Sequence, residues 1–199
     1  MRPVWAAILV SISFAFGAGP PLAMRDLDGR TQSPFQPKGL AQILFFIMTD
    51  CPISNFYAQE IQRICAGYAS QDAGCSLVYE DVEEDATAVR KHMEEYRYRG
   101  IPAIVDADRK AARQAGATVT PEVVVVDHGG KIRYRGRIDN FYAGLGKPRR
   151  QATTHELRDA LDAVLAGKPV AVPEAKAVGC YIVPPGIITP GINTPGIIK

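Results

Sequence analysis

Residues 44–55 read LFFIMTDCPISN, and this stretch decides which fold the rest of the chain can adopt. It begins as an apolar run, passes a polar pair, and then presents Cys51 and Pro52 ahead of a helical pattern that starts at Ser54. We interpret it as a buried strand that delivers a cysteine to the N-terminus of a helix. Unpaired N–H groups and the helix dipole stabilise a thiolate at such a position, and the thiolate is the reactive form of cysteine.

The composition excludes several classes of protein. The chain has 199 residues, of which 47% are hydrophobic, and this suits one globular domain with a real core plus tails. A net charge of +2 with nearly balanced acidic and basic residues argues against a nucleic-acid-binding protein, which would carry a basic stripe. The histidines His92, His128 and His155 are scattered, and no histidine–cysteine cluster has the spacing of a structural zinc site. The sequence therefore indicates neither a metal nor a cofactor.

Residues 1–19 have the pattern of an export signal. A positive start is followed by a short apolar run at 5–16 and by small residues at 17–19. The run is too short for a comfortable membrane span, so a cleaved signal peptide is the favoured interpretation. The alternative is an uncleaved N-terminal anchor, the only case in which we expect contact with a membrane. Either way the folded part would be periplasmic or extracellular, where disulfides persist.

Strand-like and helix-like segments alternate behind the opening stretch. The continuous apolar run at 40–48 predicts a strand buried on both faces, as in a parallel or mixed sheet covered by helices. Further strands are expected at 75–82, 103–106, after Pro121 and at 131–138, and helices at 54–70, 86–98, 109–115 and 154–166, with a hairpin turn at 128–130 and a loop at 139–150. After 168 the chain has no helical period and ends in the repeats PGIIT, PGINT and PGIIK, whose Pro-Gly pairs predict an extended tail.

This order resembles the thioredoxin-like fold, and more specifically the exported redoxin and thiol-disulfide oxidoreductase-like proteins. Two motifs carry the resemblance: FFIMTDCPISN at 45–55, and VTPEVVVVD at 119–127, with a weaker match in GKIRYRGRID at 130–139. In thioredoxin-like proteins a cis-proline beside the active cysteine stands where Pro121 precedes its strand. The resemblance implies an α/β fold with a central mixed sheet flanked by helices. The resemblance covers residues 25–167, the redoxin domain. With the export pattern and the repeats, this divides the chain into a signal peptide (1–19), that domain and a cysteine-containing extension with the repeat tail (168–199).

Two departures from related families bear on the chemistry. Thioredoxins carry a second cysteine three residues after the first, where this chain has Ser54, so CPIS stands in place of CxxC. Peroxiredoxins carry a threonine three residues before their cysteine, whereas Thr49 lies only two before Cys51. The site therefore lacks a local disulfide partner and matches the peroxidase pattern poorly.

The predicted site combines two catalytic cysteines with four substrate-binding residues. Cys51 is the proposed nucleophile, and Pro52 fits the first helical turn, where its missing N–H costs nothing. Ser54 either contacts the thiolate or caps the helix, and capping is the favoured role. If Pro121 is cis, the backbone of Thr120 would face the extended segment of a substrate. Asp50 would raise the pKa of a thiol that lies close to it; the alternative is that Asp50 points to solvent.

The second sulfur of the redox cycle is left open by the sequence. Cys180 is one candidate, because its segment could swing back to Cys51; a small thiol or a partner protein is another. Cys65 is favoured as a small buried hydrophobic residue, and a structural Cys65–Cys75 bridge is the competing interpretation.

The leading functional interpretation is an extracytoplasmic thiol-disulfide oxidoreductase that uses Cys51 on protein or small-molecule thiols and disulfides. The first alternative is a peroxiredoxin-like thiol peroxidase. The second is a binding module that keeps the fold without catalysis.

Overall fold

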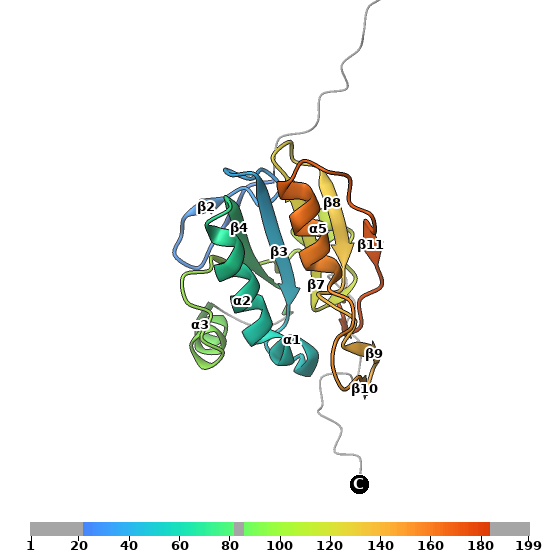
Figure 1. Ribbon diagram of the computed structural model, residues 1–199. Coiled ribbons are helices and arrows are strands. Elements are labelled where there is room, and N and C mark those ends of the chain that lie inside the picture. The colour runs from blue at the N-terminus through green and yellow to red at the C-terminus, as the bar shows by residue number, and fades with distance from the viewer. Residues whose placement is uncertain (1–21, 82–85, 184–199) are drawn as a thin grey trace, which may run out of the picture.

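The computed structural model describes residues 22–81 and 86–183 (Figure 1). The predicted signal peptide and the Pro-Gly repeats lie outside these residues. The central sheet has six strands in the order β11-β8-β7-β3-β4-β5. These strands are β3 (Ala41–Ile47), β4 (Ala73–Tyr79), β5 (Ala103–Val105), β7 (Glu122–Asp127), β8 (Ile132–Gly136) and β11 (Glu174–Ala175). The sheet is mixed, because β3 runs parallel to β4 but antiparallel to β7.

Five helices and three short strand pairs complete the described fold. The helices are α1 (Pro52–Phe56), α2 (Ala58–Ala69), α3 (Ala86–Glu95), α4 (Lys110–Ala115) and α5 (Glu156–Leu165). The strand pairs are β1 (Met24–Arg25) with β2 (Thr31–Gln32), β9 (Tyr142–Gly144) with β10 (Lys147–Pro148), and β6 (Val119–Thr120) with β12 (Cys180–Tyr181). The predicted α/β thioredoxin-like class is confirmed, and the expected loop at 139–150 contains the β9–β10 hairpin.

Strand β3 is central because its side chains are buried on both faces of the sheet, as its apolar run predicts. Ile43, Phe45 and Ile47 belong to the larger core, which includes apolar residues of α2 and α5. Leu44 and Phe46 belong to a second core, which includes the alanines of α4. In Figure 1, α2 and α5 lie next to each other across one face of the sheet. A strand packed from both sides gives the residue at its end a rigid support.

The predicted helix behind Cys51 is divided in two, and Ser54 does not cap it. Helix α1 begins at Pro52, and its N-cap is Cys51, whose sulfur accepts the N–H of Ser54 at 3.5 Å. The chain then turns at Tyr57 before α2 starts. The prediction of Ser54 as the N-cap is therefore wrong. Pro52 fits the first helical position, so the helix begins one turn earlier and the thiol itself becomes the cap.

A disulfide joins Cys65 of α2 to Cys75 of β4. Cys65 is buried in the larger core, as the favoured interpretation expects, but it is not a free thiol, because the competing Cys65–Cys75 bridge is present. Cys65 faces the sheet from α2, and β4 begins only a few residues after that helix ends. The bridge anchors α2, and with it the end of α1, to the strand next to β3.

We expect the double substitution Cys65→Ala and Cys75→Ala to lower the free energy of unfolding by about 2–3 kcal/mol. The cross-link closes a loop with a sequence separation of 10, and removing it gives back conformational entropy to the unfolded chain. Urea unfolding under non-reducing conditions measures the difference. With Cys51 and Cys180 starting as free thiols, as in the structure, added reductant should destabilise the wild type and leave the double variant unchanged. Equal stability of the two proteins without reductant would contradict the prediction.

The segment after α5 returns to the domain. Strand β11 pairs in parallel with β8 at the edge of the central sheet, and β12 pairs with β6 in an antiparallel manner. Flanking hydrogen bonds join Arg135 N to Pro173 O at 3.0 Å and Arg137 N to Ala175 O at 3.1 Å. This path brings Cys180 from the extension to the end of β3. Among the helices of the described residues, none is long and apolar enough to cross a membrane.

Candidate active site

Cys51 lies fully buried at the junction between β3 and α1. Its N–H donates to Met48 O at 3.4 Å, and its C=O accepts the N–H of Asn55 at 3.0 Å. The cysteine is therefore held by the strand end on one side and by the first turn of α1 on the other. This is the strand-to-helix position that the sequence predicts.

A chain of partly or fully buried hydrogen bonds supports the turn before Cys51. The N–H and hydroxyl of Thr49 donate to Asp81 Oδ1 at 2.9 and 2.8 Å, and Thr49 O accepts Nδ2 of Asn55 at 2.9 Å. Since that amide nitrogen is a donor, Asn55 Oδ1 must accept from His92 Nε2 at 2.8 Å, and His92 Nδ1 then accepts the Tyr79 hydroxyl at 2.9 Å. Burial lowers the pKa of His92, which favours the neutral ring that this arrangement needs.

A cis peptide bond between Thr120 and Pro121 lies against the thiol. The protonated Cys51 sulfur donates to Thr120 O at 3.1 Å, across 69 positions of sequence. The resemblance implies this cis-proline, and the structure contains it. Thr120 and Cys51 are both fully buried. The cis-proline turn at Thr120 and the strand-to-helix turn at Cys51 therefore form one compact unit.

Cys180 reaches the same unit from the other side. It stands opposite Thr120 in the β12–β6 pair, and a hydrogen bond links its thiol to Cys51. Neither sulfur is in a disulfide. The structure therefore brings together all six predicted site residues: Cys51, Pro52, Ser54, Thr120, Pro121 and Cys180.

The two neighbouring thiols differ in pKa, so only one of them carries the negative charge at neutral pH. The hydrogen bond from the Cys180 side chain, opposed by burial and helped by Ser54 and Thr120, lowers the pKa of Cys51 to about 5. The buried hydroxyls of Ser54 and Thr120 make no other hydrogen bond within the described residues. The contact of the Cys51 S–H with Thr120 O favours the neutral form of Cys51. It is a single contact, however, whereas several donors stabilise the Cys51 thiolate. Cys51 is therefore the thiolate of the pair at neutral pH.

Cys180 is correspondingly the proton-bearing partner. Its hydrogen bond to Cys51 raises the pKa of Cys180, and burial and the charges of Cys51 and Asp50 add to this effect. The expected influence of Asp50 on a thiol pKa thus falls on Cys180. The negative charge of Cys51 also acts on Tyr142 in β9, whose pKa is raised by burial and by this charge.

Aromatic side chains surround the exposed end of α1. Phe56 is half-exposed and stacks on Phe141 with ring centroids 4.7 Å apart, while Tyr142 meets Phe56 edge-on at 5.3 Å. Offset stacking and edge-on contacts are the favourable geometries for aromatic pairs. The loop after β8 is therefore fastened to the helix that carries Cys51.

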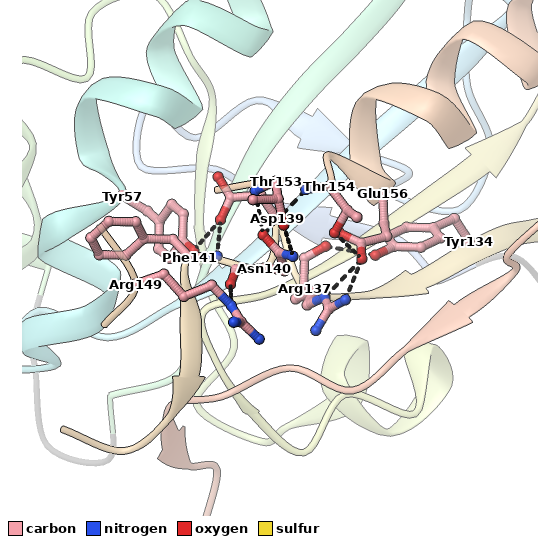
Figure 2. A network of polar contacts seen from close by, with 10 residues as sticks. All are labelled: Tyr57, Tyr134, Arg137, Asp139, Asn140, Phe141, Arg149, Thr153, Thr154 and Glu156. Carbon is pink, nitrogen blue, oxygen red and sulfur yellow. Dashed lines mark hydrogen bonds and ion pairs between the residues drawn. The ribbon is translucent and has the colours of Figure 1, made fainter. Parts of the chain in front are cut away.

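A polar network holds that loop in place (Figure 2). The hydroxyl of Tyr57 donates to Asp139 Oδ1 at 2.5 Å, and the same oxygen accepts the N–H of Phe141 at 2.9 Å. The amide of Asn140 bonds both the N–H and the hydroxyl of Thr153, each at 2.7 Å. Figure 2 shows further links from Arg149 to Asn140 and from Arg137 to Glu156. The network joins α1, the end of β8 and the start of α5 around the site.

The family model described as AhpC/TSA family matches residues 18–135. The chain belongs to the AhpC/TSA family. The matched part contains Cys51 and Pro121, whereas Cys180 lies outside it. Comparison with curated proteins finds no match.

Solved structures similar to this AhpC/TSA family member share its fold over most of their length. A hypothetical protein of Sinorhizobium meliloti 1021 is 25% identical with a TM-score of 0.69, covering 81% of this chain and 89% of its own. An uncharacterized conserved protein of Geobacillus kaustophilus is 25% identical with a TM-score of 0.71, covering 82% and 88%. A secreted disulfide oxidoreductase of Mycobacterium tuberculosis, 16% identical with a TM-score of 0.52, covers 74% and 96% and shows the fold alone. Family and fold together support a thiol redox role.

Several residues around the site of this AhpC/TSA family member escape prediction from the sequence. Asn55 and His92 support the turn before Cys51, and Tyr142 lies near the negative charge of the Cys51 thiolate. Gly179, which has no side chain, allows the chain before β12 to approach Thr120 closely. Asn55 stands within the opening motif and Gly179 directly precedes Cys180. Their closeness in sequence to the two cysteines is a signal from which their roles could be predicted. His92 and Tyr142 come from separate elements, and nothing local in the sequence links them to Cys51.

Replacing Cys180 by alanine should raise the pKa of Cys51, because the variant loses the strongest contributor to its lowering. The wild-type thiolate should be half protonated near pH 5 and fully formed at neutral pH. Ultraviolet absorbance of the thiolate against pH measures this midpoint. Cys180→Ser is the matched control, since its hydroxyl keeps a donor at the same place and should shift the midpoint less. An unchanged midpoint in Cys180→Ala would exclude Cys180 as the main donor.

Proposed function

We propose that this protein is a thiol-disulfide oxidoreductase in which Cys51 attacks a disulfide and Cys180 resolves the product. One observation carries the proposal: Cys51 and Cys180 both meet the residue that precedes the cis-proline. The sulfur of Cys51 contacts Thr120 O at 3.1 Å, and Cys180 stands opposite Thr120 in the β12–β6 pair. The second thiol that CPIS lacks is thus supplied by a strand 129 positions further along the chain.

The reaction needs two exchanges of sulfur. The Cys51 thiolate attacks one sulfur of a substrate disulfide, so that a mixed disulfide forms, the substrate S–S bond breaks, and the released thiolate takes a proton from water. Cys180 then loses its proton and attacks the Cys51 sulfur of the mixed disulfide. The Cys51–Cys180 disulfide forms and the second substrate thiolate leaves. The protein has given two electrons to the substrate, and an external dithiol returns them.

The pKa values of the two cysteines suit this order. While Cys51 is a thiolate, the hydrogen bond that it accepts and its negative charge both raise the pKa of Cys180. Both effects disappear when Cys51 enters a mixed disulfide, because its sulfur is then neutral. Cys180 is therefore held protonated until there is a mixed disulfide to attack, and its pKa then falls towards the ordinary value.

The peroxidase alternative has weaker support. The hydroxyl of Thr49 donates to Asp81 Oδ1 at 2.8 Å, so it is committed to holding the turn. A threonine that assists peroxide chemistry would need its hydroxyl at the cysteine. The non-catalytic alternative does not explain why a second free cysteine is placed against Cys51.

Export is part of the proposal. It is supported by the signal pattern at 1–19 and by the Cys65–Cys75 bridge, because disulfides of this kind persist mainly outside the cytoplasm. N-terminal sequencing of protein from the periplasmic or extracellular fraction tests it. A start just after the small residues at 17–19 supports a cleaved signal, and a start at Met1 would instead indicate the anchored form.

The redox proposal is tested with a disulfide-linked peptide and wild-type protein in which Cys51 and Cys180 are free thiols and the Cys65–Cys75 bridge is closed, as in the structure. We expect one equivalent of peptide disulfide to be reduced and one Cys51–Cys180 disulfide to form, identified by non-reducing peptide mapping. Consumption of hydrogen peroxide should be far slower than this exchange. Free Cys180 after complete reaction, or peroxide consumption faster than disulfide exchange, would overturn the proposal.

A further inference from the structure

Residues 177–183, which we call the strap, lie directly on the backbone next to the cis-proline. Cys180 pairs with Thr120 and Tyr181 with Val119, and the N–H of Ile182 donates to Thr118 O at 3.0 Å. Gly179 makes the closest approach: a Cβ at this position would stand 1.9 Å from Thr120 O. No side chain larger than hydrogen fits there unless the strap moves away.

The strap is attached through its backbone and through apolar side chains: Val178 and Cys180 pack against the larger core and Ile182 packs against the second core. Besides the pairing with β6, the carbonyl of Val183 accepts Nε of the buried Arg109 at 3.3 Å. The side chain of Tyr181 is three-quarters exposed. Backbone pairing along the edge of a short strand can be made by any extended polypeptide, and it selects only for residues that fit at close contacts.

Cys51 is fully buried although it is the nucleophile of the proposed reaction. Cys180 and its neighbours stand on the side from which Thr120 would otherwise be open to a substrate. Strand β12 has only two residues, and β11 anchors the chain separately against β8, partly through the Glu174–Arg135 ion pair at 2.5 Å. The strap can therefore leave while the segment before it stays on the sheet, since a short edge pair opens locally at low cost.

We infer that the strap occupies the strand position of the substrate, so that a disulfide-bearing polypeptide segment and Cys180 use the edge of β6 in turn. This inference rests on the proposed function and adds the substrate class: an extended polypeptide with a small residue before its cysteine, as in the Gly179-Cys180 pair of the strap itself. A substrate strand displaces the strap and places its disulfide at Cys51. Cys180 can then return to Cys51 only after the bound substrate segment has unpaired from β6.

The order of bonds follows the two exchanges described above. The displaced strap carries Cys180 away while the mixed disulfide between Cys51 and the substrate forms. Its return brings the Cys180 sulfur to Cys51, the substrate thiolate leaves, and the protein disulfide closes. A high concentration of polypeptide disulfide should therefore slow turnover, because a second substrate strand competes with the returning strap. A low-molecular-mass disulfide, which makes no strand, should not show this inhibition.

Gly179→Ala tests the strap directly in the full chain. The added methyl group overlaps Thr120 O, so the closed strap becomes less stable. At a pH above the ordinary thiol range, where Cys51 is ionised with or without its Cys180 donor, Cys51 should therefore react with iodoacetamide about tenfold faster or more. Peptide mapping assigns the label to Cys51. Gly67→Ala is the matched control, because a Cβ on this α2 residue meets nothing within 4 Å. Equal Cys51 labelling rates in Gly179→Ala and wild type would overturn the inference.

A peptide probe keeps the test independent of how the variant folds. The probe is the disulfide-linked dimer of AVGCYIV, the sequence of residues 177–183, and its matched version carries the Gly179→Ala change. We expect the glycine peptide to form a mixed disulfide with Cys51 about tenfold faster than the alanine peptide. Equal rates for the two peptides would contradict strand binding and leave the redox proposal standing. A Cys51 that reacts with neither peptide nor oxidised glutathione would overturn the proposed function itself.

Discussion

Replacing Cys51 by serine is expected to lower the rate of disulfide exchange by about 1000-fold or more, with little change in the fold. A serine hydroxyl is similar in size but does not ionise at neutral pH, so the variant has no nucleophile at the end of β3. The thiolate that it replaces is held ionised by Cys180 and by donors from α1. Reduction of a disulfide-linked peptide, followed by release of free thiol, measures the loss.

The thermal unfolding of Cys51→Ser should remain close to that of the wild type. Ser54 N donates to the residue at position 51, and a hydroxyl can accept this bond as the sulfur does. Loss of exchange with an intact fold assigns the chemistry to Cys51. Wild-type rates in this variant would mean that another cysteine performs the attack.

Replacing Cys180 by serine should separate the two halves of the reaction. The first attack still occurs, because Cys51 remains and the serine hydroxyl still offers it a donor. The mixed disulfide then persists, since no neighbouring thiol can attack it. We expect a burst of one equivalent of released substrate thiol, followed by turnover that is about 100-fold slower than in the wild type.

Mass spectrometry of the intact Cys180→Ser protein should show the substrate attached, and peptide mapping should place it on Cys51. The double variant Cys65→Ala and Cys75→Ala serves as the control for general cysteine loss, because its two site cysteines are intact and should still form their own disulfide. Full turnover by Cys180→Ser would indicate that an external thiol resolves the mixed disulfide.

The fold could be predicted because its determining residues are local in sequence. The apolar run of β3 specifies a strand buried on both faces, and Cys51-Pro52 specifies the strand-to-helix turn that follows. The Thr120-Pro121 pair ahead of four valines marks the second turn of the site. In each case a few adjacent residues, read with the family resemblance, contain the information.

The rest of the site depends on contacts between distant residues. Cys65 has the spacing of a residue on the inner face of a helix, and that pattern does not distinguish a packed thiol from a bridged one. The link from Asn55 to His92 spans 37 positions and needs α3 to be placed before it can be seen. The partner of Cys51 depends on the path of β11 and β12, which carry almost no periodic signal because each has two residues.

The two cysteine pairs impose opposite requirements on the surroundings of the protein. The Cys65–Cys75 bridge must stay closed, since it fastens α2 to the sheet, whereas the Cys51–Cys180 pair must be opened after each cycle. Cys51 is the better leaving group of the pair because Ser54 and Thr120 still stabilise its thiolate when Cys180 is bonded to another sulfur, so an incoming dithiol can open that pair first. The physiological electron donor must therefore be selective: it must reduce the Cys51–Cys180 disulfide and leave the Cys65–Cys75 disulfide intact.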